Sequence, residues 1–163
     1  MIRLLIYWYA NQKARVRWGS KYSDWFAVKN GVRQGGILSP LLFNVYVDVI
    51  SIELNKTLIG CTIGSLIVNH LYYADDLILF SPSHKGLQIL LNMCNGIGSS
   101  LDIKINESKT VYTVFKTKKD KDWICQQFIM KGNAIEYCKN YKYIGHIVNA
   151  SLDDDGDIHS HII

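Results

Sequence analysis

The sequence has few of the features that mark membrane, disulfide-rich or zinc-ribbon proteins. No apolar run reaches the roughly 18 residues of a membrane-spanning helix. The opening stretch, MIRLLIYWYANQ, contains no small-residue cleavage site of the kind found in signal peptides. The four cysteines are far apart and include no CxxC pair, which argues against a zinc ribbon and a disulfide framework. These absences favour an intracellular chain with reduced thiols, in either the nucleus or the cytoplasm.

Proline is also scarce, and repeats, low-complexity tracts and flexible linkers are missing. Only two prolines occur, Pro40 and Pro82, and each stands where an element is expected to begin or end. With 163 residues, 48% apolar and 20% charged, the chain has the composition of one globular domain with a real core. The net charge of +4 is spread along the chain, so charge alone only weakly favours a polyanionic partner.

Hydrophobic periodicity predicts helices interleaved with short strands. Helices are expected near residues 2–12, from Ser39 onward and over 85–95, with Ser39 as N-cap and Pro40 at the first helical position. The apolar face of the helix from Ser39 is expected to comprise Leu41, Val45, Val49 and Ile52. The corresponding face of the following helix comprises Leu87, Leu90, Leu91 and Cys94.

Tight turns separate several of the expected strands. These strands fall within residues 14–18, 25–30, 66–81, 110–115, 125–130 and 140–148. Residues 19–24 should join the first two as a hairpin. The pattern predicts an α+β fold with an antiparallel sheet and helices packed on one face.

The stretch LYYADDLILF, residues 71–80, places two adjacent aspartates among apolar residues. Burying unpaired carboxylates is costly, so the pair needs a solvated or charge-balanced setting. One interpretation is a β-hairpin whose tip happens to be acidic, since Asp suits tight turns. The other is a hairpin that presents Asp75 and Asp76 to divalent metal, which would offset their mutual repulsion.

The surrounding motifs favour the second interpretation. The stretch NGVRQGGILSPLLFNVYVDVI precedes YADD, and INESKT and YKYIGHIV follow it in order. Together these motifs closely resemble the palm domain of reverse transcriptases from non-LTR (LINE-type) retrotransposons. The resemblance covers roughly residues 2–150 and implies a polymerase palm-like fold. It also implies an RNA-directed DNA polymerase that transfers nucleotides to a primer 3′-hydroxyl with two Mg²⁺ ions, or Mn²⁺ in their place.

The resemblance also assigns roles to particular residues. Asp75 and Asp76 would be catalytic metal ligands, and Lys109 would approach the triphosphate. The implied nucleotide-binding residues are Arg33, Gln34, Gly35 and Gly36. The implied primer-binding residues are Tyr73, Tyr143 and Gly145. Ordinary structural roles remain open: a turn for the two glycines, a strand aromatic for Tyr73 and a solvent-facing side chain for Lys109. Asp48 is read as solvated.

The family's first metal-binding aspartate lies in an FD strand upstream of these motifs, and no such motif occurs before Gly31. We therefore expect residues 1–150 to form a truncated palm, and 151–163 to begin the connection to the thumb or to form a tail. The implied partners are an RNA template, a DNA primer, dNTPs and the fingers and thumb segments of a parent polypeptide. No membrane partner is expected. An isolated chain of this kind should be largely inactive.

Two other functions remain as alternatives. The chain could be a non-catalytic nucleic-acid-binding remnant of a decayed element, which would carry the same motifs. An unrelated Mg²⁺ phosphohydrolase built on Asp75 and Asp76 would need further acids or histidines at ligand spacing, and the sequence offers none that is convincing.

Overall fold

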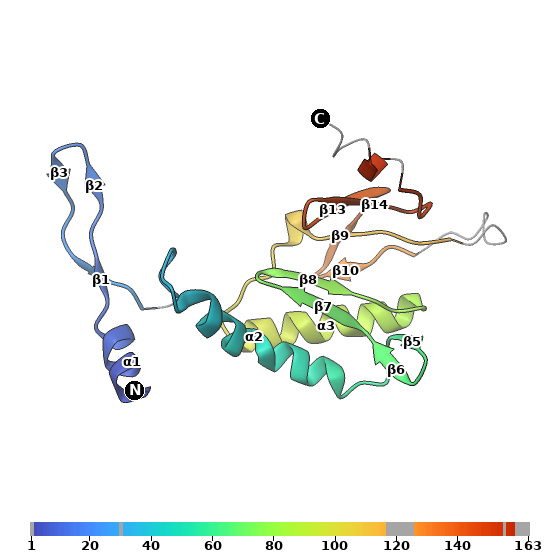
Figure 1. Cartoon of the computed structure of the whole chain (residues 1–163), viewed down its shortest axis with the longest axis horizontal. Helices are drawn as coiled ribbons and strands as arrows, with labels where there is room; N and C mark the ends of the chain where they lie inside the picture. Colours follow the sequence, from blue (N-terminus) through green and yellow to red (C-terminus); the bar gives the residue numbers. More distant parts are fainter. Residues whose placement is uncertain (1, 30, 117–125, 155, 159–163) are drawn as a thin grey trace. The chain divides into compact units, whose positions relative to one another are not determined.

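A computed structural model describes residues 2–29, 31–116, 126–154 and 156–158. The chain divides into two compact units, residues 1–48 and 49–163. The main helices are α1 (Ile2–Ala10), α2 (Ser39–Asn55) and α3 (His84–Ser100), with a short 3₁₀ helix, η1, at Glu107–Lys109 (Figure 1). Within the described ranges, no helix combines the length and apolar character needed to cross a bilayer.

The first unit contains α1 and one long irregular hairpin, as the sequence predicted. Its strands are β1 (Lys13–Ala14), β2 (Arg17–Trp18), β3 (Lys21–Tyr22) and β4 (Phe26–Ala27). β1 pairs with β4, and β2 pairs with β3, both antiparallel. The turn is tighter than the predicted loop over 19–24, because only Gly19 and Ser20 separate the paired Trp18 and Lys21.

The start of α2 differs from the N-cap prediction. Ser39 is itself the first helical residue, and its hydroxyl donates a hydrogen bond backward to the carbonyl of Arg33. The carbonyl of Leu38 accepts from the Leu42 amide and so begins the helical hydrogen bonding. Ser39 therefore ties the preceding loop to the helix instead of capping the helix.

The predicted buried face of α2 is wrong. The predicted residues are exposed: Leu41, Val45, Val49 and Ile52 retain 61%, 67%, 40% and 49% of their accessible surface. The buried residues are Val47, Ile50 and Leu54, which follow the i, i+3, i+7 spacing of a different stripe. Apolar residues surround most of this helix, so periodicity alone does not select the face that packs.

The second unit has two adjoining apolar clusters on α3. Ile50 and Leu54 pack with Leu90 and Cys94, and partly buried side chains from β7 and β8 cover this cluster. The second cluster is formed by Leu91, Phe128, Met130 and Ile135, with Leu87 packed against it. The predicted apolar face of α3 is thus confirmed, and its i, i+3, i+4, i+7 spacing serves both clusters.

The strands of the second unit form two-stranded ladders. Their bounds are β5 (Cys61–Ile63), β6 (Leu66–Val68), β7 (His70–Tyr73), β8 (Asp76–Leu79), β9 (Val111–Tyr112), β10 (Ile129–Met130), β11 (Asn133–Ala134), β12 (Glu136–Tyr137), β13 (Asn140–Tyr143) and β14 (His146–Asn149). Antiparallel pairs join β5 to β6, β7 to β8, β10 to β11 and β13 to β14. The β9–β12 pair is parallel. Helices and hairpins are mixed as expected, while the palm-like sheet stays a prediction.

A buried amide joins the end of α2 to the start of β7. The Asn69 side chain is buried, and its Nδ2 donates to the carbonyl of Leu54 at 2.8 Å and to Oγ1 of Thr57 at 3.1 Å. The backbone carbonyl of Asn69 also accepts a hydrogen bond from the backbone amide of Phe80 at 2.8 Å. The Leu54 carbonyl also accepts from the amide and the hydroxyl of Thr57, so Asn69 adds a third donor there and holds the start of the β7–β8 hairpin on the end of α2.

Part of the predicted organisation falls outside the described residues. Cys125, in the predicted strand over 125–130, is one such residue. The region 151–163, predicted as a connection or tail, is described only at 151–154 and 156–158. There, Asp157 pairs with His146 at 2.9 Å and accepts from the amide of Ile147 at 2.8 Å, so this segment is attached to β14.

Candidate functional site

The two adjacent aspartates lie at the tip of a β-hairpin, as predicted. β7 and β8 pair in register from His70 opposite Leu79 to Tyr73 opposite Asp76, which leaves Ala74 and Asp75 as the turn. Asp75 and Asp76 are both exposed. Exposure removes the desolvation cost that would make a buried carboxylate pair intolerable.

The turn that presents Asp75 is strained. Ala74 has φ of +53°, in the left-handed region that β-carbon-bearing residues seldom occupy. Such a conformation costs on the order of 1 kcal/mol and persists only when the surrounding structure imposes it. A two-residue hairpin turn requires such a conformation, and Ile144 adopts a similar one, with φ of +50°, in the β13–β14 turn, so the turn geometry accounts for the strain at Ala74.

The two faces of the hairpin have different surroundings. Tyr72 and Leu77 stand opposite each other and pack against the core beneath. Tyr73 and Asp76 form the last pair before the turn, on the alternate face, and both are exposed. Figure 1 shows α3 on one side of β7–β8 and β13–β14 on the other. The hairpin therefore rests on the helical core and presents its acidic tip away from it.

Tyr141 of β13 lies close to the acidic tip. Burial raises the pKa of the Tyr141 hydroxyl, and the negative charge of Asp76 is the next cause of the increase. Its ring also stacks with that of Tyr143 at a centroid distance of 6.2 Å. The structure thus brings the β13–β14 hairpin, which holds two of the three predicted primer-binding residues, Tyr143 and Gly145, to the Asp76 side of β7–β8.

The β13–β14 turn explains the presence of Gly145. Tyr143 pairs with His146, so Ile144 and Gly145 form a two-residue turn. Both have positive φ, +50° and +89°, as a type I′ hairpin turn requires. Glycine adopts this geometry without strain, so a structural role for Gly145 is sufficient, and its primer contact stays a prediction.

Lys109 lies at the end of η1 and is exposed. The same short helix is anchored through Glu107, which accepts from Asn133 at 2.8 Å and pairs with Lys131 at 3.3 Å. The Asn133 hydrogen bond, followed by the Lys131 interactions, lowers the pKa of Glu107. The β10–β11 hairpin therefore fixes the segment that carries Lys109. The approach of Lys109 to a triphosphate stays a prediction.

The glycine-rich loop belongs to the first unit. Arg33, Gln34 and Gly35 are exposed, and the Gly36 amide donates to the Arg33 carbonyl at 3.0 Å. Gly35 has φ of +76°, and a β-carbon on Gly36 would lie 2.5 Å from the Ser39 hydroxyl. The turn alone therefore accounts for both glycines. The nucleotide contacts of Arg33 and Gln34 stay a prediction.

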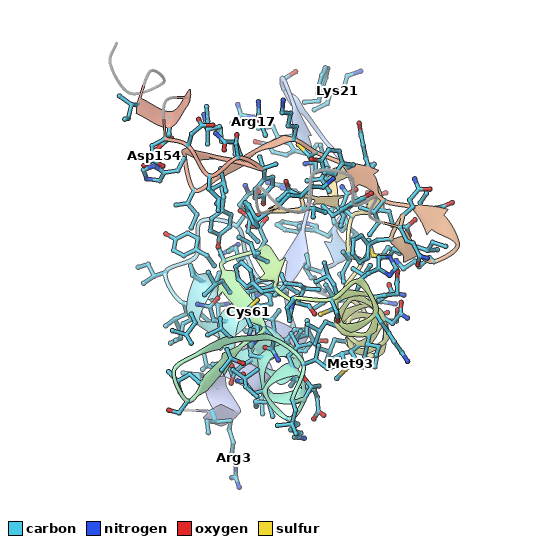
Figure 2. The ribbon with its side chains drawn as sticks, turned by 90° about the vertical axis from the view of Figure 1, so that its right-hand side faces the viewer. Arg3, Arg17, Lys21, Cys61, Met93 and Asp154 are labelled. Atoms are coloured by element: carbon cyan, nitrogen blue, oxygen red, sulfur yellow. The ribbon has the colours of Figure 1, made fainter. Side chains whose placement is uncertain are left out.

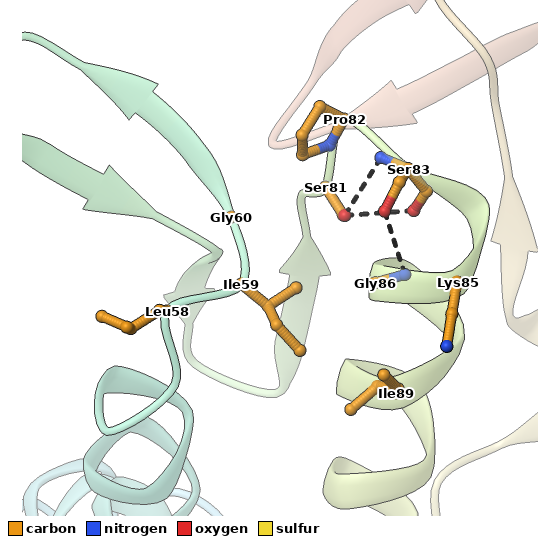
Figure 3. Close-up of a pocket in the computed structure, with 9 residues that line it drawn as sticks. All are labelled: Leu58, Ile59, Gly60, Ser81, Pro82, Ser83, Lys85, Gly86 and Ile89. Carbon is orange, nitrogen blue, oxygen red and sulfur yellow. Dashed lines mark hydrogen bonds between the residues drawn. The ribbon is translucent and has the colours of Figure 1, made fainter.

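A shallow pocket of about 340 Å³ lies elsewhere in the second unit. It is formed by the loop before β5 and the start of α3, and it contains none of the predicted site residues (Figure 3). Ser83 caps α3 by accepting from the Gly86 amide at 3.1 Å, and Ser81 interacts with Ser83. The hydroxyls in this pocket are thus engaged in starting the helix.

The hairpin tip offers suitable metal ligands, but the ligand set there is incomplete. Asp75 and Asp76 offer the oxygen ligands that Mg²⁺ and Mn²⁺ prefer. Among the described residues, no group of three or more His, Cys, Asp or Glu side chains is placed to hold a metal ion. Asp48, which the sequence predicted to be solvated, is indeed exposed on α2.

The comparisons with known proteins agree with the sequence motifs. Residues 2–148 match the family model described as reverse transcriptase (RNA-dependent DNA polymerase). This chain belongs to the reverse transcriptase family.

Curated relatives place the similarity among retrotransposons. The chain is 35% identical over 132 residues to the retrovirus-related Pol polyprotein from the type-2 retrotransposable element R2DM of Drosophila melanogaster. It is 37% identical over 92 residues to the corresponding polyprotein from the type-1 element R2 of Nasonia vitripennis. These matches cover 76% and 56% of this chain, but only 12% and 9% of the relatives. The resemblance to non-LTR retrotransposon reverse transcriptases is confirmed.

Sequence reasoning missed Tyr141 as a residue near the site. The alternation in NYKY places Tyr141 and Tyr143 on one face of β13, so the signal was present once Tyr143 was singled out. The proximity of Tyr141 to Asp76 joins segments far apart in the sequence, and local patterns do not determine it.

Proposed function

We propose that this chain contributes part of the catalytic centre of an RNA-directed DNA polymerase. The observation that carries the proposal is the pair of exposed carboxylates, Asp75 and Asp76, at a hairpin tip inside the family-matched region. The polymerase palm is the arrangement that this proposal assumes. Its partners are an RNA template, a DNA primer and dNTPs.

Asp75 and Asp76 would hold Mg²⁺, or Mn²⁺, through their carboxylate oxygens. When bound, a pair of such ions activates an attacking oxygen and neutralises the charge that develops on a leaving phosphate. The contribution of Asp75 and Asp76 is to hold their carboxylates where the metal binds. Their location on a ladder packed against the core keeps the two carboxylates in a fixed direction.

The remaining residues surround the substrates in this proposal. Arg33 and Gln34 contact the incoming nucleotide, with Gly35 and Gly36 shaping the loop that presents them. Lys109 places a positive charge, and a proton that can be donated, near the departing pyrophosphate. Tyr73, Tyr143 and Gly145 position the primer end. We expect little primer extension by the chain alone, because two carboxylates make a weak and poorly ordered metal site.

Metal binding gives a direct test that does not need turnover. Mn²⁺ titration of the isolated chain, followed by electron paramagnetic resonance, should show weak binding, because two carboxylates supply only part of the oxygen ligands that such an ion takes. Asp75→Asn and Asp76→Asn should each weaken it. The matched control is Asp48→Asn, which removes an equally exposed carboxylate from α2.

The same variants test the polymerase assignment. In a primer-extension assay on an RNA template with Mg²⁺, the isolated chain should give at most trace product. Equal loss of Mn²⁺ binding in the Asp48 and Asp75 variants would contradict the site. Efficient extension that survives Asp75→Asn would contradict the assigned chemistry.

A further inference from the structure

The return segment, which comprises the described residues within 151–158, folds back onto the β13–β14 hairpin. The Asn149 side chain donates from Nδ2 to the Asp153 carbonyl at 2.8 Å, and its Oδ1 accepts from the Asp153 amide at 3.1 Å. The Asp154 carbonyl then accepts from the Asp157 amide at 3.1 Å. These bonds turn the chain back, so that the segment lies beside the strand that it follows (Figure 1).

The backbone amide of Ile147 lies on the outer edge of β14. The Ala150 amide donates to the Lys139 carbonyl at 3.0 Å, and hydrogen-bonded pairs alternate with non-bonded pairs along an antiparallel ladder. Counted from that pair along the register of β13 and β14, Lys142 and Ile147 form a non-bonded pair. The Ile147 amide therefore points away from β13 and needs an acceptor from outside the ladder.

Asp157 supplies that acceptor and holds the neighbouring residue as well. Its Oδ1 accepts from the Ile147 amide at 2.8 Å, and its Oδ2 pairs with Nδ1 of His146 at 2.9 Å. The bond to Ile147 is partly buried, and hydrogen bonds to a carboxylate are stronger than those between neutral groups. One carboxylate of the return segment therefore fixes two consecutive residues of β14.

These two residues come directly after the turn that presents Tyr143 and Gly145. A two-residue turn of this type requires positive φ at both of its central residues, and Ile144 has φ of +50°. β-Branched residues seldom adopt that conformation, so it persists only where the surrounding structure imposes it. The ladder constrains the turn on the side of β13, and Asp157 constrains it from the outer edge of β14.

We propose that Asp157 is a positioning residue for the primer end, because its carboxylate holds the β13–β14 turn in the geometry that contacts the primer. It acts through His146 and Ile147, which follow the turn. The inference rests on the proposed function, which assigns Tyr143 and Gly145 to the primer. Asp157 does not itself bind the primer, since its negative charge repels phosphates.

Amide hydrogen exchange of the 163-residue chain, measured by nuclear magnetic resonance, tests the hold on β14 without any substrate. Asp157→Ala should speed exchange of the Ile147 amide by at least about tenfold, the fold-change that corresponds to losing one hydrogen bond to a charged group. Asp157→Asn should retain most of the protection at about pH 8, where imidazoles are neutral. Its side chain can give an oxygen to the Ile147 amide and an N–H to Nδ1 of His146.

The matched control for both assays is Asp154→Ala. Asp154, labelled in Figure 2, is an exposed carboxylate of the same return segment. Its backbone carbonyl accepts from the Asp157 amide, and alanine keeps that carbonyl. The variant therefore removes one negative charge and leaves the Asp157 contacts in place, so exchange of the Ile147 amide should not change.

Primer positioning is tested with a labelled DNA primer annealed to an RNA template, titrated with the chain in the presence of EDTA and followed by fluorescence anisotropy. Tyr143→Ala and Asp157→Ala should each weaken binding by about three- to tenfold, the range for losing one hydrogen bond. The sign of the change is decisive, because removing a negative charge by itself strengthens binding to nucleic acid. Asp154→Ala should therefore bind at least as tightly as the wild-type chain.

A double-mutant cycle shows whether Asp157 acts through the turn. Residues that act through one shared contact have non-additive effects. The variant that combines Tyr143→Ala with Asp157→Ala should bind no more weakly than Tyr143→Ala alone, whereas independent roles would make the two losses add. Asp157→Asn should retain most of the primer affinity, and circular dichroism verifies that each variant keeps the wild-type fold.

The outcomes separate this inference from the proposed function. Unchanged exchange of the Ile147 amide in Asp157→Ala, or additive losses in the double variant, would overturn the positioning role. An affinity loss in Tyr143→Ala without one in Asp157→Ala would overturn that role alone. No loss in Tyr143→Ala, or no binding by the wild-type chain, would overturn the primer contact of the proposed function and the positioning role with it.

Discussion

Tyr141 and Asp76 lie close together although they come from strands far apart in the sequence. Burial and the Asp76 charge both raise the pKa of the Tyr141 hydroxyl. Asp76 belongs to the hairpin tip proposed to hold metal, and Tyr141 shares its strand with Tyr143, proposed to hold the primer. The charge of Asp76 therefore acts on the strand that carries one of the predicted primer-binding residues.

We expect Asp76→Asn to lower the pKa of Tyr141, because it removes a negative charge that opposes formation of the phenolate. Burial remains, so the pKa should stay above its usual value of about 10. Nuclear magnetic resonance titration with tyrosine labelled at Cζ measures this directly. Asp102→Asn, another exposed carboxylate of the second unit, serves as the control. An unchanged Tyr141 pKa in Asp76→Asn would show that the two hairpins do not meet there.

The corrected face of α2 predicts which of its side chains stabilise the fold. Leu54→Ala should lower the free energy of unfolding by about 2–5 kcal/mol, since it empties a fully buried site. Val45→Ala on the same helix should change it by no more than about 0.5 kcal/mol, because that side chain is exposed. Urea denaturation distinguishes the two. A large loss of stability in Val45→Ala and a small one in Leu54→Ala would show that the face predicted from periodicity is the buried one.

Asn69→Ala should lower the free energy of unfolding by roughly 1–3 kcal/mol. The substitution removes the two hydrogen bonds that the buried Asn69 amide donates, one to the Leu54 carbonyl and one to the Thr57 hydroxyl. Asn55→Ala, at an exposed position of the same helix, gives the baseline for losing an asparagine. Chemical denaturation of both variants makes the comparison, and equal small losses would rule out the amide as the joint between α2 and β7.

Stability should fall as the pH drops below about 6.5. Burial lowers the pKa of His70, so the unfolded chain binds a proton at a pH where the folded chain does not. The stabilisation is complete above the unfolded pKa and is lost as the pH falls toward the folded value. His70→Gln should reduce this part of the pH dependence in urea unfolding measured at several pH values. If the variant kept the wild-type pH dependence, the loss of stability at low pH would come from groups other than His70.

Local sequence was sufficient wherever one pattern dominated. The two-residue period around ADD predicted the β7–β8 hairpin, and a clear helical stripe predicted the buried face of α3. Similarly, the ordered motifs of the sequence are enough by themselves to indicate the reverse transcriptase family. In each case neighbouring residues alone carry the information, because turns, strands and amphipathic helices are set by short-range geometry.

Tertiary structure decided the features for which local sequence patterns allowed more than one arrangement. Apolar residues surround α2, so only packing against α3 could choose Ile50 and Leu54 over Val49 and Ile52. Ser39 was predicted to cap the helix, whereas its hydroxyl donates to the Arg33 carbonyl in the preceding loop. The approach of Tyr141 to Asp76 depends on how separate hairpins pack, since no local period links them. Sequence thus determined the elements and the family, whereas long-range packing determined which faces are buried and which motifs meet.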